Sequence, residues 1–477
     1  MEIGYTPATE LAARIRRGDL SPVAVVEYFL DRIERRDDEI NAYATVCDEA
    51  AGAAAAEAER ALRAGEEVGP LHGVPVAVKD LTNVAGVPTT FGSKLFADFV
   101  PEDDAVIVER LKDAGAIVLG KTNTPEFGRK PMTTNLLHGT TSNPWDLTKT
   151  AGGSSGGSAA ALAAGLAPLA TGSDAAGSLR IPASACGTVS IMADFGRVPM
   201  ASRPDGFVDT HPYTVTGPMA RSVEDAALLL DVVSGPDDGD PFSLPATDGS
   251  YLETTRRGVG HLDIAYSPDL GICEVSGTVE GVVEEAVEDL RRTGATVDRI
   301  DGMFEDWGTP HGALEVLLQD RYGGMYDDFV RDYGIDLLER RADVTEEVVS
   351  RVERALELDA LDVRRAERVR TEACDAVRGV LSEYDLLVAP TMGMLPFEKG
   401  TKPSEIDGVP IDPLHGWALT WPFNLTGNPA AAVPAGVVDG LPVGLQLVGR
   451  RLEDGTVVSA AAAFERIRPW LDAYPDR

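Results

Sequence analysis

The chain has 477 residues, of which 44% are hydrophobic and 25% charged, and its formal net charge is −34 at pH 7. The composition is ordinary for a globular protein and the length is ample for a large core, but the charge excludes a basic face for nucleic acids and gives acidic substrates no steering. Because the acidic residues are scattered along the chain, the sequence predicts an acidic surface, typical of a cytoplasmic enzyme from a salt-accumulating, halophilic organism.

Residues 1–66 are predicted to form helices that pack on the outside of the core. Thr6-Pro7 and Ser21-Pro22 each place a capping residue before a proline, a pattern typical of helix starts. Apolar residues then recur at helical spacing, and residues 50–64 are rich in alanine.

Residues 67–234 are predicted to form the catalytic core, because apolar runs alternate with helical patterns. Residues 74–78 and 116–119 are typical of buried strands, and residues 104–114 of the helix between them. This alternation predicts an α/β fold in which a large mixed β-sheet is covered by helices on both faces.

The rest of the chain divides into a mainly helical region and a return to the sheet. Residues 235–383 are predicted to be mainly helical, with a strand–helix–strand unit at 262–300 and helices near 311–332 and 345–382, and the family resemblance described below implies that this variable region shapes the substrate site. Residues 384–477 are predicted to supply strands at 385–389 and 442–448 and a helix at 456–467. We expect all four segments to form one large domain.

Other site classes find little support in the sequence. The four cysteines, Cys47, Cys186, Cys273 and Cys374, are far apart, and no histidines cluster, so no zinc site, other metal site or disulfide framework is expected. The N-terminus lacks the pattern of a signal peptide, and the apolar stretch 159–170 is too short to span a bilayer. We expect no cofactor, no membrane and no direct nucleic-acid contact.

Three separated motifs carry residues suited to hydrolysis by a serine nucleophile. Lys79 ends an apolar strand that would bury its amine, and burial lowers the pKa of a lysine toward that of a usable base. Ser154 and Ser155 lie in the glycine-rich run 152–158, and Ser178 follows a loop of small residues. The run 152–158 lacks the pattern of a phosphate-binding loop, although either serine of the pair could cap the helix that follows.

These motifs, with their order and the spacing of the two serines, resemble the amidase signature family. Further stretches at 69–73, 143–146, 217–227, 422–429 and 441–446 are also family-like, so the resemblance covers roughly residues 5 to 470. It implies a Lys–cis-Ser–Ser triad formed by Lys79, Ser154 and Ser178. In this scheme Lys79 draws a proton through Ser154, and Ser178 attacks a small carboxamide to form an acyl-enzyme.

The same resemblance assigns supporting roles around the nucleophile. The backbone amides of Ala175, Ala176, Gly177 and Ser178 would form the oxyanion hole, and Ser155, Asp174 and Arg180 would hold the site in shape. Two departures from the family pattern stand out. Ala176 replaces a usual glycine, which would restrict a positive φ, and Ser190–Asp194 replaces a usual Gly-Leu-Lys-Pro-Thr-like segment.

Two alternatives stay open from the sequence. The chain could be the glutaminase (A) subunit of a tRNA-dependent amidotransferase, which would pass ammonia to a partner, or a family member impaired by the two departures. Phe127, Met132, Leu136, Leu137, Trp417, Trp421 and Phe423 are candidates for the pocket lining as well as for the core. A homodimer is also plausible for a chain of this kind.

Overall fold

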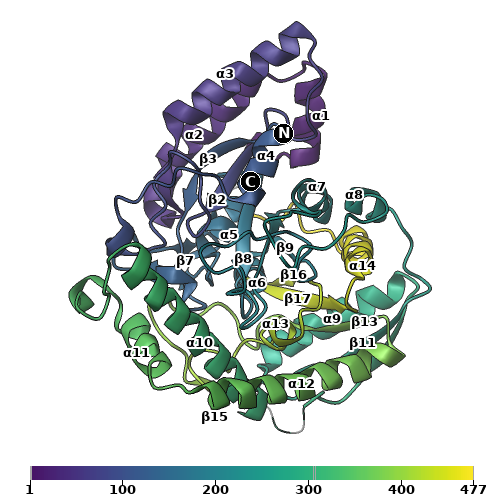
Figure 1. Ribbon diagram of the computed structural model, residues 1–477. Coiled ribbons are helices and arrows are strands. Elements are labelled where there is room, and N and C mark those ends of the chain that lie inside the picture. The colour runs from purple at the N-terminus through teal and green to yellow at the C-terminus, as the bar shows by residue number, and fades with distance from the viewer. Residues whose placement is uncertain (1–2, 305, 307, 476–477) are drawn as a thin grey trace.

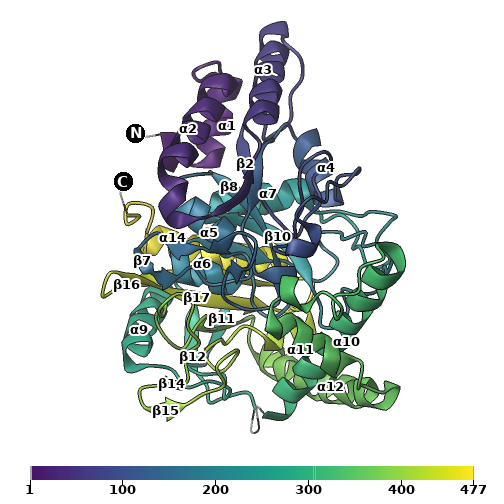
Figure 2. The ribbon, with the colours of Figure 1, turned by 90° about the vertical axis from the view of Figure 1, so that its left-hand side faces the viewer.

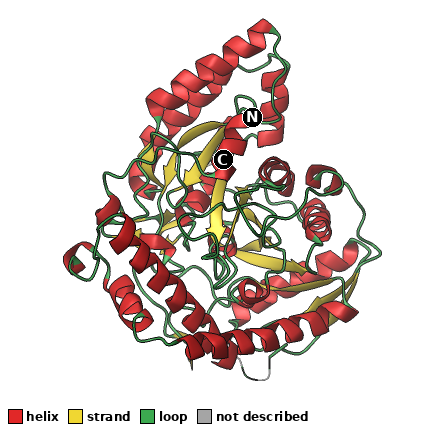
Figure 3. Ribbon diagram, viewed as in Figure 1, coloured by secondary structure: helices red, strands yellow, loops and turns green. Residues whose placement is uncertain are grey.

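A computed structural model describes residues 3–304, 306 and 308–475, and an 11-stranded sheet runs through its centre (Figures 1 and 3). Along this sheet the strands follow in the order β1 (Tyr43–Val46), β3 (Ile117–Thr122), β2 (Pro75–Lys79), β8 (Leu169–Asp174), β10 (Val215–Ala220), β9 (Val189–Met192), β16 (Ala430–Val438), β17 (Leu441–Gly449), β13 (Leu386–Pro390), β11 (Asp263–Tyr266) and β12 (Thr296–Arg299). Three small two-stranded sheets are β4–β5 (Thr134–Asn135, Gly139–Thr140), β6–β7 (Ser142–Asn143, Asp146–Thr150) and β14–β15 (Glu405–Ile406, Val409–Pro410).

The central sheet is mixed in direction. β2 is parallel to β3 and β8, and β11 is parallel to β12 and β13. Antiparallel pairs join β8 to β10, β10 to β9, β9 to β16, β16 to β17 and β17 to β13. The predicted fold class, a large mixed sheet in an α/β protein, is therefore confirmed. Strands from all four predicted segments of the chain take part in this sheet.

Helices cover both faces of the sheet (Figures 1 and 2). They are α1 (Ala8–Arg16), α2 (Pro22–Ile40), α3 (Asp48–Ala64), α4 (Val106–Asp113), α5 (Gly156–Ala163), α6 (Arg180–Cys186), α7 (Val223–Val233), α8 (Tyr251–Thr254), α9 (Gly277–Arg292), α10 (Gly308–Asp332), α11 (Glu346–Ala355), α12 (Ala360–Glu383), α13 (Pro422–Thr426) and α14 (Asp454–Ile467). Both α6 and α7 contact β9, and both α6 and α14 contact β17. α7 and α14 also contact each other, so they lie together on one face of these strands, and α6 lies on the other face.

The apolar pattern of β2 places the end of that strand in the interior. Val76, Ala77 and Val78 are fully buried between β3 and β8, since a strand with neighbours on both sides and helices on both faces has no solvent contact. The strand therefore delivers Lys79, its last residue, into the core with no exposed side-chain surface.

The N-terminal segment differs from the prediction in two ways. It contributes an edge strand, β1, which pairs antiparallel with β3, so residues 1–66 are not wholly helical. The cap predicted at Thr6-Pro7 is also wrong, because α1 begins at Ala8 and its first amides donate to the carboxylate of Asp225 from α7. Ser21 caps α2 as predicted, its hydroxyl accepting from the amide of Ala24.

Helices α10, α11 and α12 lie at the end of the molecule opposite α1, α2 and α3 in both views (Figures 1 and 2). The helix predicted at 345–382 is divided into α11 and α12, because Asp359 opens a new capping box. Within the described ranges no helix is both long and apolar enough to cross a membrane.

Candidate active site

The Lys79 amine is surrounded by three serine hydroxyls. Its Nζ donates to Ser154 Oγ at 2.6 Å, Ser155 Oγ at 2.8 Å and Ser173 Oγ at 2.9 Å. Burial lowers the pKa of Lys79 from its ordinary value of 10.5 to about 7, and the Asp174 carboxylate opposes this lowering only in part. A lysine in this setting is neutral in a large fraction of molecules at neutral pH, so it can accept a proton. Ser173 had no signal in the sequence.

Close backbone packing shapes the turn that carries Ser154. A Cβ on Gly152, whose φ is 73°, would lie 2.9 Å from a Pro182 backbone atom, and the Gly153–Ser154 peptide bond is cis. Ser155 directly precedes α5, but its hydroxyl does not cap that helix. Instead Ser155 Oγ accepts from the amide of Ser173 at 3.2 Å and from Lys79, so it braces β8 against the lysine.

The loop that carries Ser178 is held by the carboxylate of Asp174. This carboxylate accepts from the Gly177 amide at 2.6 Å and from the Leu179 amide at 3.1 Å. The Gly177 amide is thus already engaged, which removes it from the predicted set of oxyanion donors and leaves the amides of Ala175, Ala176 and Ser178. Ser178 O in turn accepts from the Ser155 amide at 3.2 Å, so the two serine motifs adjoin.

The positive φ in this loop belongs to Gly177, at 120°, and not to Ala176. The strain expected from the alanine is therefore absent, because Ala176 occupies an ordinary backbone region. The Ala176 carbonyl accepts from Thr420 Oγ1 at 2.9 Å, and a Cβ on Gly177 would overlap the same Thr420 side chain.

Arg180, which is fully buried, ties the serine loop to the C-terminal part of the chain. Its guanidinium pairs with Asp174 at 3.0 Å and donates to Thr420 O at 2.8 Å, Gln446 Oε1 at 3.3 Å and Asn424 Oδ1 at 2.7 Å. Burial alone would raise the pKa of Asp174, but Arg180, Asn424 and the loop amide outweigh it and hold the pKa below its usual value. Sequence reasoning placed Asn424 and Gln446 in family-like stretches without giving either a role.

The segment Ser190–Asp194, which departs from the family pattern, lies in and after strand β9 and does not line the pocket that Ser178 lines. Residues 190–192 belong to β9, where they pair with β10 and β16. Asp194 is buried and accepts from Arg451 Nε, while Met192 Sδ receives a weak contact from Asn424 Nδ2 at 3.6 Å. Asn424 thus links this segment to the Ser178 loop.

A pocket opens over these residues. It is lined by Leu81, Phe127, Gly128, Arg129, Lys130, Pro131, Ser154, Ser173, Ala175, Ala176, Ser178, Ile181, Thr214, Leu318, Arg321, Tyr322, Arg351 and His415. The serines thus form one wall, and α10, α11 and the segment before α13 supply the opposite one. Of the predicted pocket residues only Phe127 lines this pocket. Met132 and Trp417 pack in a separate buried cluster, and Trp421 and Phe423 belong to the main core.

A larger cavity of about 560 Å³ shares Leu81, Phe127, Arg321 and Tyr322 with this pocket. Part of its lining is aromatic, with Phe91, Phe96, Phe329 and Tyr333 besides the shared Phe127 and Tyr322. Its volume is in the range of ligand cavities, and its apolar rings suit an aromatic or long aliphatic group. Because they share these four residues, the larger cavity adjoins the pocket that Ser178 lines.

Two arginines give the pocket an unusual polarity. Arg129 Nη1 and Arg351 Nε and Nη1 are buried and have no hydrogen-bond partner among the described residues. Burial, with Arg351 nearby, lowers the pKa of Arg129 to about 10. Buried donors without partners are costly, so these nitrogens favour a ligand that brings an acceptor oxygen.

Comparison with protein-family models finds a match to the amidase family over residues 24–458. An acylamidase from Rhodococcus erythropolis is 40% identical over 476 residues, covering 99% of this chain and 97% of that protein. The glutamyl-tRNA(Gln) amidotransferase A-subunit of Carboxydothermus hydrogenoformans is 35% identical over 492 residues, covering 100% of both chains.

Solved structures give the same picture. A bacterial aryl acylamidase described as one of the amidase signature enzymes superposes with a TM-score of 0.94 at 34% identity, covering 98% of each chain. The likeness therefore extends over nearly the whole chain.

Proposed function

Because this chain belongs to the amidase signature family, whose enzymes hydrolyse amides, we propose that it cleaves an acyl amide through an acyl-enzyme on Ser178. One observation carries the proposal. Lys79 is fully buried, its pKa is lowered to about 7, and its Nζ lies 2.6 Å from Ser154 Oγ, in the pocket that Ser178 also lines. A buried neutral lysine next to a serine pair is the arrangement that proton transfer to a base requires.

The reaction follows from the order of these groups. Neutral Lys79 takes the proton of Ser154, and Ser154 takes the proton of Ser178 as the Ser178 oxygen attacks the amide carbonyl carbon. The C–N bond then breaks, and the proton returns along the same relay to the leaving nitrogen, which departs as ammonia or an amine. Water then attacks the ester carbonyl of the acyl-enzyme and gives its proton to the same relay, which returns a proton to Ser178 as the carboxylate leaves.

The oxyanion of each tetrahedral intermediate is assigned to the amides of Ala175, Ala176 and Ser178. They are the candidate donors that remain once the Gly177 amide is bound by Asp174. Asp174 and Arg180 act as positioning residues, since they fix the loop and touch no reacting atom. Loss of a single oxyanion donor typically lowers the rate by about 10² to 10³.

The lining of the two cavities indicates the substrate class. An aromatic cavity next to the serines suits a bulky apolar group, and the unpartnered nitrogens of Arg129 and Arg351 suit an oxygen acceptor on the same molecule. We therefore assign the substrate to the acyl amides with an aromatic or extended apolar part. The likeness to two acylamidases supports this class.

The test is amide hydrolysis by the purified full chain in molar KCl, which screens the net charge of −34. The panel contains anilides of different acyl length, aliphatic carboxamides and glutamine. We expect anilides to be cleaved by the wild type, with no activity in Ser178→Ala and full activity in Ser190→Ala. Ser190 is a suitable control because its buried hydroxyl has no partner among the described residues and lies outside the pocket.

Labelling by a fluorophosphonate distinguishes an active serine nucleophile from an impaired family member. Labelling of the wild type at Ser178, with no labelling of Ser178→Ala, supports the proposal that Ser178 is the nucleophile. A folded wild-type protein that is neither labelled nor active on any amide would refute the proposal and indicate an impaired family member.

The full-length match to the A-subunit of an amidotransferase favours one second candidate, a glutaminase component of such a complex. In that case glutamine is the preferred amide and its hydrolysis rises when a partner protein is present. Preferred hydrolysis of anilides by the chain alone would exclude this candidate. The predicted homodimer stays a prediction.

A further inference from the structure

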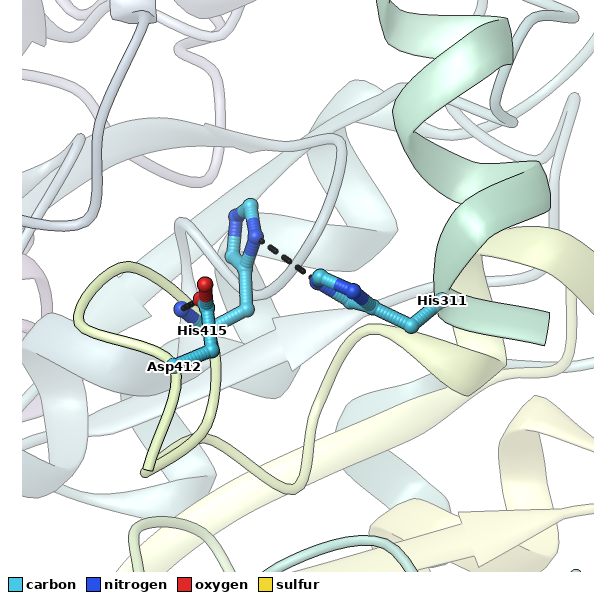
Figure 4. A group of neighbouring side chains, drawn as sticks. All are labelled: His311, Asp412 and His415. Atoms are coloured by element: carbon cyan, nitrogen blue, oxygen red, sulfur yellow. Dashed lines mark hydrogen bonds between the residues drawn. The ribbon is translucent and has the colours of Figure 1, made fainter. Parts of the chain in front are cut away.

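Two histidines and an aspartate that the sequence keeps far apart meet beside the pocket (Figure 4). His311 lies in the first turns of α10, and Asp412 and His415 lie in the loop between β15 and α13. Each offers one ligand atom, and the three atoms all lie within 4.8 Å of one another. Figure 4 shows the ring of His311 directed from its helix toward the ring of His415, with the Asp412 carboxylate on the loop side.

His415 Nδ1 has two close neighbours that can each offer a lone pair. His415 Nδ1 lies 3.3 Å from His311 Nε2 and 3.3 Å from Glu315 Oε1. A ring nitrogen carries either one hydrogen or one lone pair, so Nδ1 either shares one hydrogen between these two neighbours at long distance or places its lone pair beside theirs. A cation can take the place of that shared hydrogen, because the ring nitrogens can each direct a lone pair at it.

The separation of 3.3 Å between the two ring nitrogens fits a tetrahedral metal site. Zinc is bound by imidazole nitrogens and carboxylate oxygens at about 2.0–2.2 Å, and ligand atoms on a tetrahedron of that size are about 3.3–3.5 Å apart. Two histidines with one carboxylate, and a remaining position for water, form a ligand set that zinc favours.

We propose that His311, Asp412 and His415 bind one divalent transition-metal ion, for which Zn²⁺ is the best match. Backbone contacts already orient the aspartate, and oriented ligands are typical of metal sites. Asp412 Oδ1 accepts from the amides of Leu414 at 3.0 Å and His415 at 2.7 Å, which fixes the carboxylate and the loop. His415 is 6% exposed.

The charge balance is compatible with a dication. Arg351 lies nearby, but its Nη2 pairs with Glu315 Oε2 at 3.0 Å, so the two charges offset each other. The ligands themselves carry one negative charge when both imidazoles are neutral.

A metal ion here would join two parts of the pocket wall. His415 lines the pocket together with Ser178, and α10 lines it through Leu318 and Tyr322. The bound ion would fasten α10 to the loop that leads to Thr420, whose hydroxyl holds the Ala176 carbonyl. If the proposed amidase function is right, zinc therefore changes the activity toward bulky amides, but binding itself does not depend on that function.

The experiment is a zinc titration of the full chain, first dialysed against EDTA, in competition with a chromophoric chelator. The wild type is expected to bind one equivalent of Zn²⁺ tightly. We expect the affinity for this Zn²⁺ to fall by about 10-fold to 100-fold or more in each of the variants His311→Gln, His415→Gln and Asp412→Asn. Circular dichroism checks that each variant is folded.

Two control variants keep the test specific. His261→Gln removes an exposed histidine, and Cys273→Ser removes a thiol whose Sγ lies 3.2 Å from Gly416 O in the same loop. Both are expected to keep the tight equivalent, and Co²⁺ in the wild type is expected to give the visible bands of tetrahedral cobalt. Absence of tight binding, or binding that survives all three ligand variants, would overturn the proposal. Such a result would leave the amidase proposal untouched, since that rests on Ser178.

Discussion

Replacing Lys79 by methionine is expected to abolish amide hydrolysis and, at neutral pH, to stabilise the fold. The side chain is fully buried, and its pKa falls from 10.5 to about 7. Each pKa unit corresponds to about 1.4 kcal/mol, so burial of this amine costs about 5 kcal/mol at pH 7 and below. Methionine fills a similar volume and has no charge to desolvate.

Hydrogen bonds reduce the gain. Lys79 Nζ donates to three hydroxyls at 2.6, 2.8 and 2.9 Å, and each such bond contributes about 1 kcal/mol. The variant is then expected to be about 2 kcal/mol more stable than the wild type at pH 7. The same change removes the proposed base, so the rate on an anilide should fall by about 10⁴ or more.

The sign of the pH dependence follows from proton binding. Between pH 7 and pH 10.5 the unfolded wild-type chain binds more protons than the folded one, so the stability of the wild type rises with pH in that window. At pH 9.5 only about 1.4 kcal/mol of the cost remains, because the pH is then one unit below the unfolded pKa. The lost hydrogen bonds now outweigh it, and the wild type becomes the more stable protein by about 2 kcal/mol.

Urea unfolding of both proteins at pH 7 and pH 9.5 measures this reversal. The exposed Lys94→Met serves as the control and should show little difference at either pH. In parallel, kcat/KM of the wild type should rise with pH through a limb near 7 as Lys79 becomes neutral. A stability difference that does not change with pH would refute the reasoning, because Lys79 would then keep the same charge in both states.

Three further predictions concern the loop and the surface. Gly177→Ala should lower kcat by about 10² or more, because a Cβ at φ 120° would overlap Thr420 and shift the oxyanion donors. Ala176→Gly should leave kcat within about threefold. Equal kcat in both variants would contradict the proposed oxyanion donors. Asp174→Asn should destabilise the fold by about 3–5 kcal/mol in urea, since it leaves the fully buried Arg180 without its countercharge, and a loss below about 1 kcal/mol would argue against that role. Raising KCl from about 0.1 M to 1 M should raise the thermal midpoint, because the Debye length falls from about 10 Å to about 3 Å and screens the net charge of −34; an unchanged or lower midpoint would contradict this.

The parts of the molecule that were predictable are those encoded by contiguous residues. The apolar run before Lys79 specifies a buried strand, and the small-residue motifs specify the two tight loops, so the lysine and both serines could be placed in advance. β16 was missed, because Ala430–Val438 contains Pro434 and Gly436 and consists largely of alanine and valine. Burial between β9 and β17 overrides that weak strand propensity, and a bulge absorbs the irregular residues.

Contacts between distant residues could not be predicted in this way. Ser173 contacts Lys79 only because β2 and β8 are parallel neighbours in the sheet, and nothing in the local sequence marks that register. His311 and His415 are 104 positions apart, which is why no metal-ligand spacing was visible. The bond from the Gly177 amide to Asp174 was also not predictable, because it depends on the loop conformation.

The clamp made by Arg180 has a consequence for protein synthesis. Its partners at Thr420, Asn424 and Gln446 leave the ribosome some 240 or more residues after the arginine itself. Until then the guanidinium and the nucleophile loop lack the groups that fix them, and β9 lacks its neighbour β16. If the proposed triad is right, the nascent chain should be inert toward amides until its C-terminal strands have been translated, and prematurely terminated products would carry all three proposed catalytic side chains without hydrolysing cellular amides.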